Sequence, residues 1–110
     1  MNTKRFTESS PLKDLSFFIE KAKVGSKNHI DEIMAHLDRN TDFVTTRNID
    51  YSLSLVENRL GIKRIKYYLF RGNQVQRNYA CLFFNRKGEK RIIRRAYRRG
   101  KIDSLQAFSR

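Results

Sequence analysis

Hydrophobic side chains recur along this chain at intervals of three and four residues, the spacing that places them on one face of a helix. The first such stripe predicts a helix over residues 10–23, with the Ser10 hydroxyl as its N-cap and Pro11 in its first turn. Gly25 is expected to end this helix. Residues 1–9 are polar and charged and are predicted to form a disordered arm.

The same spacing predicts two more amphipathic helices in the first half of the chain. Asn28 can cap the second helix, and the apolar stripe of that helix ends at Leu37. Asp42 or a following threonine can cap the third helix, although several β-branched residues make its start indistinct. The apolar stripe of the third helix extends to Leu60, so Gly61 is predicted to be its C-terminal cap.

Glycine residues separate the helices that are predicted in the second half of the chain. These helices cover about residues 62–71, 74–86 and 89–99, and they end at Gly72, Gly88 and Gly100. The helix over 74–86 is apolar around most of its circumference, which predicts that it is the central helix of the fold. The helix over 89–99 is expected to bury Ile92, Ile93, Ala96 and Tyr97. A short seventh helix is expected around Leu105, Ala107 and Phe108.

No segment shows the sustained alternation of apolar and polar residues that is typical of a half-buried strand. The 110 residues are enough for one compact domain, and 39% of them are hydrophobic, including eight Phe and five Tyr. The sequence therefore predicts a single all-α domain over residues 10–110, built from six to seven short helices.

A pair of adjacent residues recurs at an offset of about 30 positions, which is the scale of helical-pair repeats. Arg47 and Asn48 recur as Arg77 and Asn78. Each pair opens a helix that is predicted to end in glycine, and a basic and apolar helix follows each of these glycines. The recurrence therefore predicts stacked helical hairpins.

The second copy, residues 73–88, resembles the second helix of a short HEAT-like repeat, of the kind named after phycobilisome lyases. The resemblance lies in the positions of Val75, Arg77, Ala80, Leu82 and Gly88. The first copy, residues 42–61, is weaker, because Ser52 stands where an alanine is expected. Over roughly residues 28–110, the resemblance implies antiparallel hairpins stacked in a right-handed HEAT-like array. HEAT-like folds serve protein scaffolding as well as DNA binding, so the resemblance implies no single activity.

Charge is distributed unevenly along the chain, and this bears on function. The formal net charge is +13. Residues 1–60 hold equal numbers of basic and acidic side chains, whereas residues 61–101 hold fourteen Lys or Arg and a single acid, Glu89. A field this concentrated attracts polyanions, and nucleic acid, as DNA or RNA, is therefore the expected partner. The alternatives are an acidic protein, a membrane surface and a purely solubilising role.

The helix over 89–99 carries the densest charge. Its six Lys and Arg side chains lie opposite its apolar stripe on a helical wheel, where they repel one another at i, i+4 spacing. Most of them are arginines, which suit bidentate contacts with phosphate. In the helix over 62–71, Tyr67 lies among cations and could stack on a base. The expected nucleic-acid-binding residues are Lys63, Arg64, Tyr67, Arg71, Arg77, Lys90, Arg91, Arg94, Arg95, Arg98 and Arg99.

Neither catalysis nor metal binding is expected. The basic half holds one acid and therefore lacks the clustered carboxylates that hold Mg²⁺ in nucleases. His29 and His36 lie near one side of their helix, but their separation is not a standard spacing for zinc ligands. The sequence thus predicts a small non-enzymatic nucleic-acid-binding protein without metal or cofactor. The alternative is a helical-repeat adaptor that binds an acidic protein partner.

The sequence also bears on location. Cys81 is the only cysteine, which excludes an intramolecular disulfide and fits a reducing compartment, and it is expected to be a small core residue. The polar N-terminal residues contain no apolar segment typical of a signal peptide, and no apolar run approaches the roughly 20 residues that a membrane span needs. A cytoplasmic protein is therefore expected. These patterns leave open DNA or RNA, sequence-specific or non-specific binding, and the oligomeric state.

Overall fold

The computed structural model describes residues 14–108 of the chain. The predicted arm of residues 1–9 and the predicted cap at Ser10 lie outside the described residues. Within residues 14–108 there are seven helices: α1 (Leu15–Val24), α2 (Lys27–Met34), α3 (Phe43–Leu53), α4 (Arg59–Arg71), α5 (Gln74–Arg86), α6 (Lys90–Arg98) and α7 (Ser104–Phe108). The regular structure of this range is entirely helical, which confirms the all-α prediction.

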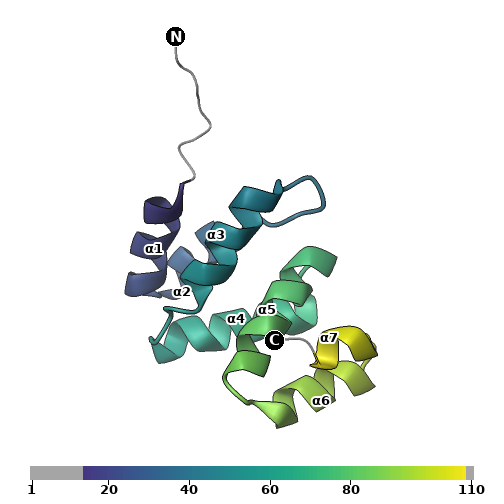
Figure 1. Cartoon of the computed structure of the whole chain (residues 1–110). Coiled ribbons are helices and arrows are strands. Elements are labelled where there is room, and N and C mark those ends of the chain that lie inside the picture. The colour runs from purple at the N-terminus through teal and green to yellow at the C-terminus, as the bar shows by residue number, and fades with distance from the viewer. Residues whose placement is uncertain (1–13, 109–110) are drawn as a thin grey trace.

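The helices form two groups, α1 to α4 and α5 to α7, which meet where α4 packs against α5 (Figure 1). In the first group α1 packs against α2 and α3, and α2 in turn packs against α4. In the second group α5 packs against α4, α6 and α7, and it also contacts α3. The prediction that residues 74–86 form the central helix is therefore confirmed.

The hydrophobic core is continuous through both groups. Its largest fully buried side chains are Phe18, Ile30, Ile33, Met34, Leu37, Ile49, Leu53, Val56, Ile65, Leu69, Cys81 and Phe84. Ile93 and Ala96 of α6 extend this core toward the C-terminus, together with Ile102. Ile92 is partly buried against the same core, and apart from the half-exposed Tyr97 the remaining side chains of α6 are charged, so one narrow apolar face holds this helix to the domain.

The boundary between the third and fourth helices differs from the prediction. α3 ends at Leu53, and a new cap forms at Asn58, whose side chain accepts a hydrogen bond from the Leu60 amide at 2.9 Å. Gly61 therefore lies inside the first turn of α4 and not at the end of α3, and Leu60 is exposed. The reason is a close helix contact, because a Cβ at Gly61 would collide with the carbonyl oxygen of Gly25.

The N-terminal caps of the first two helices also lie elsewhere than predicted. Asp14 has an extended backbone and caps α1 by accepting a hydrogen bond from the Phe17 amide at 3.1 Å, so α1 begins at Leu15. Ser26, not Asn28, caps α2. The cap predicted at Asp42 is confirmed, since its carboxylate accepts from the Thr45 amide at 2.7 Å.

The two copies of the proposed repeat are not equivalent in their glycines. Gly88 follows α5 with a φ of 73°, whereas Gly61 is buried within α4. The copies also pair differently, because α3 packs mainly against α1 while α4 packs against α5 and α2. The prediction that both helices end in equivalent glycines is therefore wrong, and the right-handed HEAT-like stacking stays a prediction.

Candidate nucleic-acid interface

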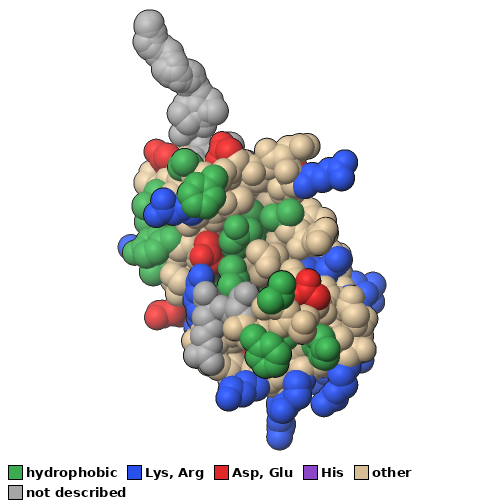
Figure 2. Space-filling model, turned by 45° about the vertical axis from the view of Figure 1, so that its right-hand side comes forward, with side chains coloured by type: hydrophobic (Ala, Val, Ile, Leu, Met, Phe, Trp, Pro, Cys, Tyr) green, Lys and Arg blue, Asp and Glu red, His purple; other side chains and the backbone are tan. Residues whose placement is uncertain are grey.

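α6 presents most of the expected binding residues on one exposed surface. Ile93 and Ala96 are buried against the core, and Ile92 is partly buried beside them. The opposite side of the helix, together with its C-cap residue Arg99, exposes six residues that we call the cations of α6: Lys90, Arg91, Arg94, Arg95, Arg98 and Arg99. Lys and Arg side chains accordingly gather over the lower end of the molecule, where α6 lies (Figure 2). Tyr97, which was predicted to be buried, is half exposed because it lies at the edge of the apolar stripe.

The six cations of α6 have no carboxylate partners among the described residues. The ion pairs within residues 14–108 join Lys21 to Glu32, Arg64 to Asp31 and Arg86 to Asp50. Glu89 stands at the N-cap of α6 without a side-chain capping bond. Mutual repulsion at i, i+4 spacing is therefore uncompensated on this helix, and a bound polyanion would relieve it.

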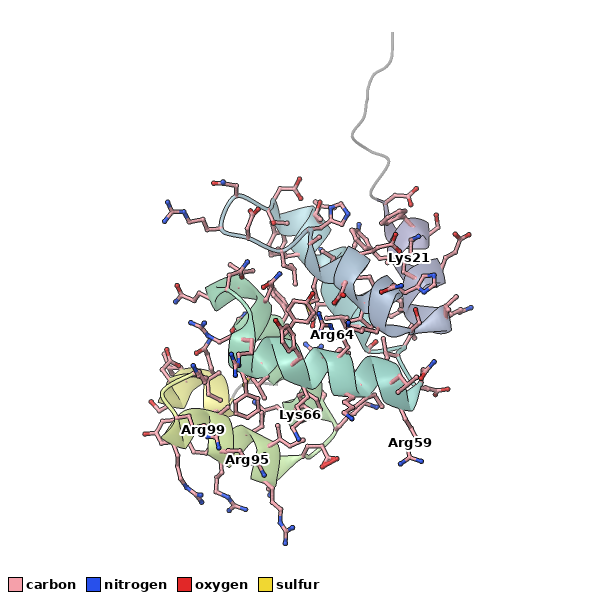
Figure 3. The ribbon with its side chains drawn as sticks, turned by 180° about the vertical axis from the view of Figure 1, so that it is seen from behind. Lys21, Arg59, Arg64, Lys66, Arg95 and Arg99 are labelled. Atoms are coloured by element: carbon pink, nitrogen blue, oxygen red, sulfur yellow. The ribbon has the colours of Figure 1, made fainter. Side chains whose placement is uncertain are left out.

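A second row of cations lies on α4. This row consists of Arg59, Lys63 and Lys66, which lie at i, i+4 and i+7 and therefore along one side of that helix. Phe70, at i+11, lies on the same side. The Arg99 guanidinium lies 5.9 Å from the centre of the Phe70 ring, which brings the end of α6 against this side of α4. Figure 3 shows cations of both helices on the same side of the molecule. We call this surface the α4–α6 basic face; it consists of Arg59, Lys63, Lys66, Arg95 and Arg99.

Two members of the basic face, Arg59 and Lys66, were not among the expected binding residues. Arg59 precedes the predicted start of its helix at residue 62, so it was not placed on the same side as Lys63. Asn58 followed by an apolar stripe was the signal that would have found it, because asparagine is a preferred N-cap.

Arg64 was expected to point to solvent, but it binds a carboxylate within the protein. Its Nε donates to Asp31 Oδ1 at 2.7 Å and its Nη2 to Asp31 Oδ2 at 3.3 Å, which joins α4 to α2. The hydroxyl of Tyr68 donates to the same carboxylate at 2.7 Å. The Arg64 guanidinium also lies over the ring of Tyr67, at 4.0 Å from the ring centre. Tyr67 is 45% exposed, but one face of its ring is occupied.

This cluster shifts the pKa values of its members. Burial acts to raise the pKa of Asp31, but the hydrogen bonds from Arg64 and Tyr68 outweigh it and hold that pKa below its ordinary value. Burial and the hydrogen bond to Asp31 raise the pKa of Tyr68 to about 12. The hydrogen bond to Asp31 also raises the pKa of Arg64. Asp31 and Arg64 are therefore both charged at neutral pH, and they neutralise each other.

Arg77 and Arg86 also form internal contacts. Arg77 donates to the carbonyl oxygen of Gly72 at 2.8 Å and to that of Lys101 at 2.9 Å, so it joins the chain after α4 to the chain after α6. Arg86 binds both oxygens of Asp50, at 2.7 and 2.8 Å. The structure thus separates the expected residues into two sets. Arg64 and Arg77 make internal contacts, while Lys63, Arg71 and the six cations of α6 are exposed.

The histidines and the cysteine make local contacts of their own. His29 shares a hydrogen bond of 2.6 Å with the Ser26 hydroxyl, and the His36 ring packs edge-on against Phe17 and Phe18. Among the described residues, no three His, Cys, Asp or Glu side chains are grouped as a metal site would require. Burial raises the pKa of the Cys81 thiol to about 11, so this core residue stays protonated at neutral pH.

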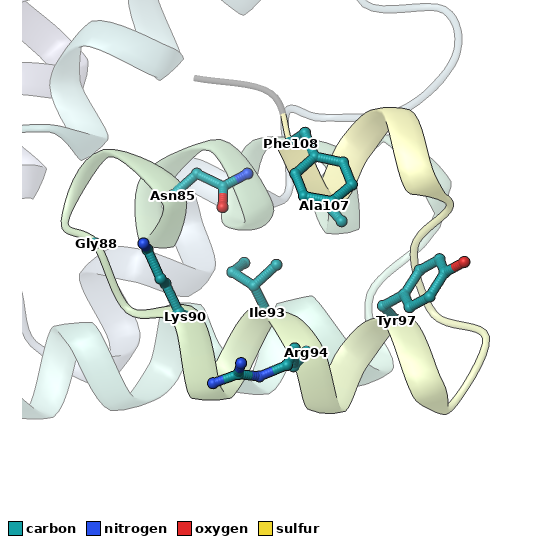
Figure 4. Close-up of a pocket in the computed structure, with 8 residues that line it drawn as sticks. All are labelled: Asn85, Gly88, Lys90, Ile93, Arg94, Tyr97, Ala107 and Phe108. Atoms are coloured by element: carbon teal, nitrogen blue, oxygen red, sulfur yellow. The ribbon is translucent and has the colours of Figure 1, made fainter.

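A pocket of about 510 Å³ lies between α6, α7 and the end of α5 (Figure 4). Its apolar wall includes Ile93, Tyr97 and Phe108. Lys90 and Arg94 stand on its α6 side, so part of the basic surface borders an apolar hollow.

Comparison with known proteins adds no precedent for this surface. No family model matches the chain, and neither a curated protein nor a solved structure shows significant similarity to it. Within residues 14–108, none of the helices has both the length and the apolar character that crossing a membrane requires. The inference of a function therefore depends on the geometry and charge of the surface itself.

Proposed function

We propose that this protein is a small non-enzymatic nucleic-acid-binding protein that grips the phosphate backbone with α6 and the α4–α6 basic face. The observation that carries the proposal is the row of six exposed cations on α6 without a carboxylate partner among the described residues. The same proposal places the protein in the cytoplasm, where its single cysteine stays reduced.

The geometry favours a polyanion that extends over more than one helix. Arg91 and Arg95 stand on successive turns of α6, about 6 Å apart along the axis. The cations of α4 continue the charged surface beyond α6, and within residues 14–108 no carboxylate is paired with either row. A nucleic-acid strand supplies regularly spaced phosphates over such a length, and the release of its counterions drives the association.

Salt dependence tests this proposal. Binding of a fluorescent duplex and of a single strand is measured by anisotropy between 50 and 200 mM salt. Contact with four phosphates gives a slope of log affinity against log salt of about −3.6 for the duplex, which is a loss of roughly 100-fold over this range. Absence of binding at low salt, or binding that does not respond to salt, would contradict the proposal.

A pair of charge-matched variants separates the surface from the net charge. Substitution of four α6 arginines, R91Q, R94Q, R95Q and R98Q, is expected to abolish binding while circular dichroism still shows a helical protein. The control removes four exposed cations of the first half instead, by K23Q, K27Q, R39Q and R47Q, and is expected to bind nearly as the native chain does. Equal weakening of binding in both variants would show that net charge alone is responsible.

The pocket beside α6 supports a second candidate function, an adaptor for an acidic protein. An apolar hollow with cations at its edge is the feature expected of such a surface. The same assays distinguish the two functions. An adaptor would bind nucleic acid weakly and without saturation, whereas the proposed function requires saturable binding.

A further inference from the structure

The pocket between α6, α7 and the end of α5 has aromatic walls that the fold does not need for its core. Tyr97 is 50% exposed and Phe108 is 84% exposed, while Ile93 at the floor is buried. The volume of about 510 Å³ falls within the range of roughly 300–1,000 Å³ that is usual for small-molecule sites. Exposed rings at the mouth of a preformed hollow are typical of sites that stack on a flat, partly apolar ligand.

The charge at this pocket identifies the class of ligand. On a helical wheel of α6, Lys90 and Arg94 lie on the flank that also carries Tyr97, whereas Arg95 and Arg99 lie on the flank that meets α4. Lys90 and Arg94 have no carboxylate partner among the described residues. They would therefore attract an anionic group that lies beside the flat ligand.

Asn85 adds a directional polar group to the apolar wall. Its amide nitrogen donates to the carbonyl oxygen of Gln106 at 3.0 Å, which fixes the side chain. Figure 4 shows its oxygen turned toward the pocket, and no donor to this oxygen occurs among the described residues. A fixed acceptor in such a place suits an exocyclic amino group, which adenine and cytosine carry and thymine and uracil lack.

We propose that this pocket holds one unpaired base of single-stranded nucleic acid. The base stacks against Tyr97 and Phe108, its amino group donates to Asn85 Oδ1, and the adjoining phosphate lies between Lys90 and Arg94. This inference rests on the proposed function and specifies it, because a duplex keeps its bases stacked inside and can use only the cationic surface. A single strand can use both.

Alanine variants of the two exposed rings test the inference. Y97A and F108A are each measured against a single-stranded dA 12-mer and against a duplex of the same length. The controls are Y51A and F43A on α3, whose rings have similar exposures of 53% and 72%. Each pocket variant is expected to lose roughly 5- to 100-fold in single-strand affinity, with duplex affinity unchanged and both controls bound as tightly as the native chain.

The outcomes separate this inference from the proposed function. If the pocket variants bind the single strand no worse than the controls while duplex binding persists, the base site is refuted and the proposed function stands. If the native chain binds neither nucleic acid, the proposed function itself fails. Weaker binding of dT than of dA, by roughly threefold, is expected from Asn85, and equal binding would refute its role. Pocket-dependent binding of an acidic, phenylalanine-containing peptide without any effect on oligonucleotide affinity would identify an acidic protein as the occupant instead.

Discussion

Lys66 and Arg64 lie two residues apart on α4, and their substitution by glutamine should affect different properties of the protein. R64Q and K66Q each remove one positive charge from the same helix. Arg64 is bound to Asp31, whereas Lys66 belongs to the α4–α6 basic face and has no carboxylate partner among the described residues. We therefore expect R64Q to cost stability and K66Q to cost binding.

The contacts of Arg64 set the size of the stability effect. R64Q removes two charge-assisted hydrogen bonds, at 2.7 and 3.3 Å, and leaves Asp31 with the Tyr68 hydroxyl as its remaining side-chain partner. Such bonds contribute about 1.5–3 kcal/mol when partly buried, and the partial exposure of this pair reduces that figure. A loss of about 2 kcal/mol is expected, which lowers the melting temperature of a domain of this size by roughly 8 °C. K66Q should change the free energy of unfolding by less than about 0.5 kcal/mol.

The binding effect follows from the number of phosphates that are neutralised. If Lys66 contacts one phosphate, K66Q reduces the magnitude of the salt slope by about 0.9. R64Q should leave the slope unchanged, because Asp31 already compensates the charge of Arg64. Screening at about 0.1 M salt limits any effect of the lost charge over distances beyond roughly 10 Å.

Urea unfolding and salt-dependent anisotropy on the two variants make the comparison. The expected pattern is a destabilised R64Q that binds with the native slope and a stable K66Q that binds with a shallower slope. A reduced slope in R64Q as large as that in K66Q would show that cations contribute through net charge alone. The distinction between a cation that is bound to a carboxylate and one that is not would then have no functional meaning.

Two further predictions concern the fold that holds the basic face in place. G61A should lower the free energy of unfolding, measured in urea, by about 1–2 kcal/mol, because the clash of the added methyl group with the backbone of Gly25 outweighs the gain in helix propensity. The control L60A, at an exposed neighbouring position, should be nearly neutral. A stabilised G61A would contradict the close contact. D31N should cost stability at pH 7, and this cost should disappear as the pH falls below about 4. The reason is that the pKa of Asp31 is lower in the folded than in the unfolded chain, so its contribution to stability is complete above the unfolded pKa and is lost as the pH falls through the folded pKa. A stability cost that stays constant down to about pH 2 would contradict the assignment.

Most of the fold could be predicted from the sequence because the helices are amphipathic and short. Within residues 14–108, the 3.6-residue spacing predicted the seven helices and the central position of α5, although it extended the third helix to Leu60. The error at Gly61 arose because glycine serves two purposes that look alike in sequence. At Gly25 it adopts a positive φ and ends a helix, while at Gly61 it permits close contact between two backbones. Only the position of the partner segment distinguishes these purposes.

The candidate interface was predictable where burial follows from periodicity alone. The exposed side of α6 opposes Ile93 and Ala96, and the wheel places both correctly. Arg64 and Arg77 could not be assigned in this way, because their partners Asp31 and Lys101 lie more than twenty residues away along the chain. A long-range hydrogen bond leaves no periodic signal, so an internally bound arginine and an exposed one look the same in sequence.

α6 carries the densest charge of the described helices although its N-terminus has no side-chain cap, and this combination bears on function. α6 lacks a side-chain N-cap bond, and the like charges of Arg91 and Arg95, and of Arg94 and Arg98, each cost about 0.2–0.5 kcal/mol. A helix of nine residues is marginal by itself, so the burial of Ile93 and Ala96 must offset these costs. Elsewhere the chain pairs cations with acids, as at Arg64 and Arg86. An arrangement that lowers the stability of one helix, in a chain able to compensate charge on others, is the kind of local inconsistency expected at a binding surface.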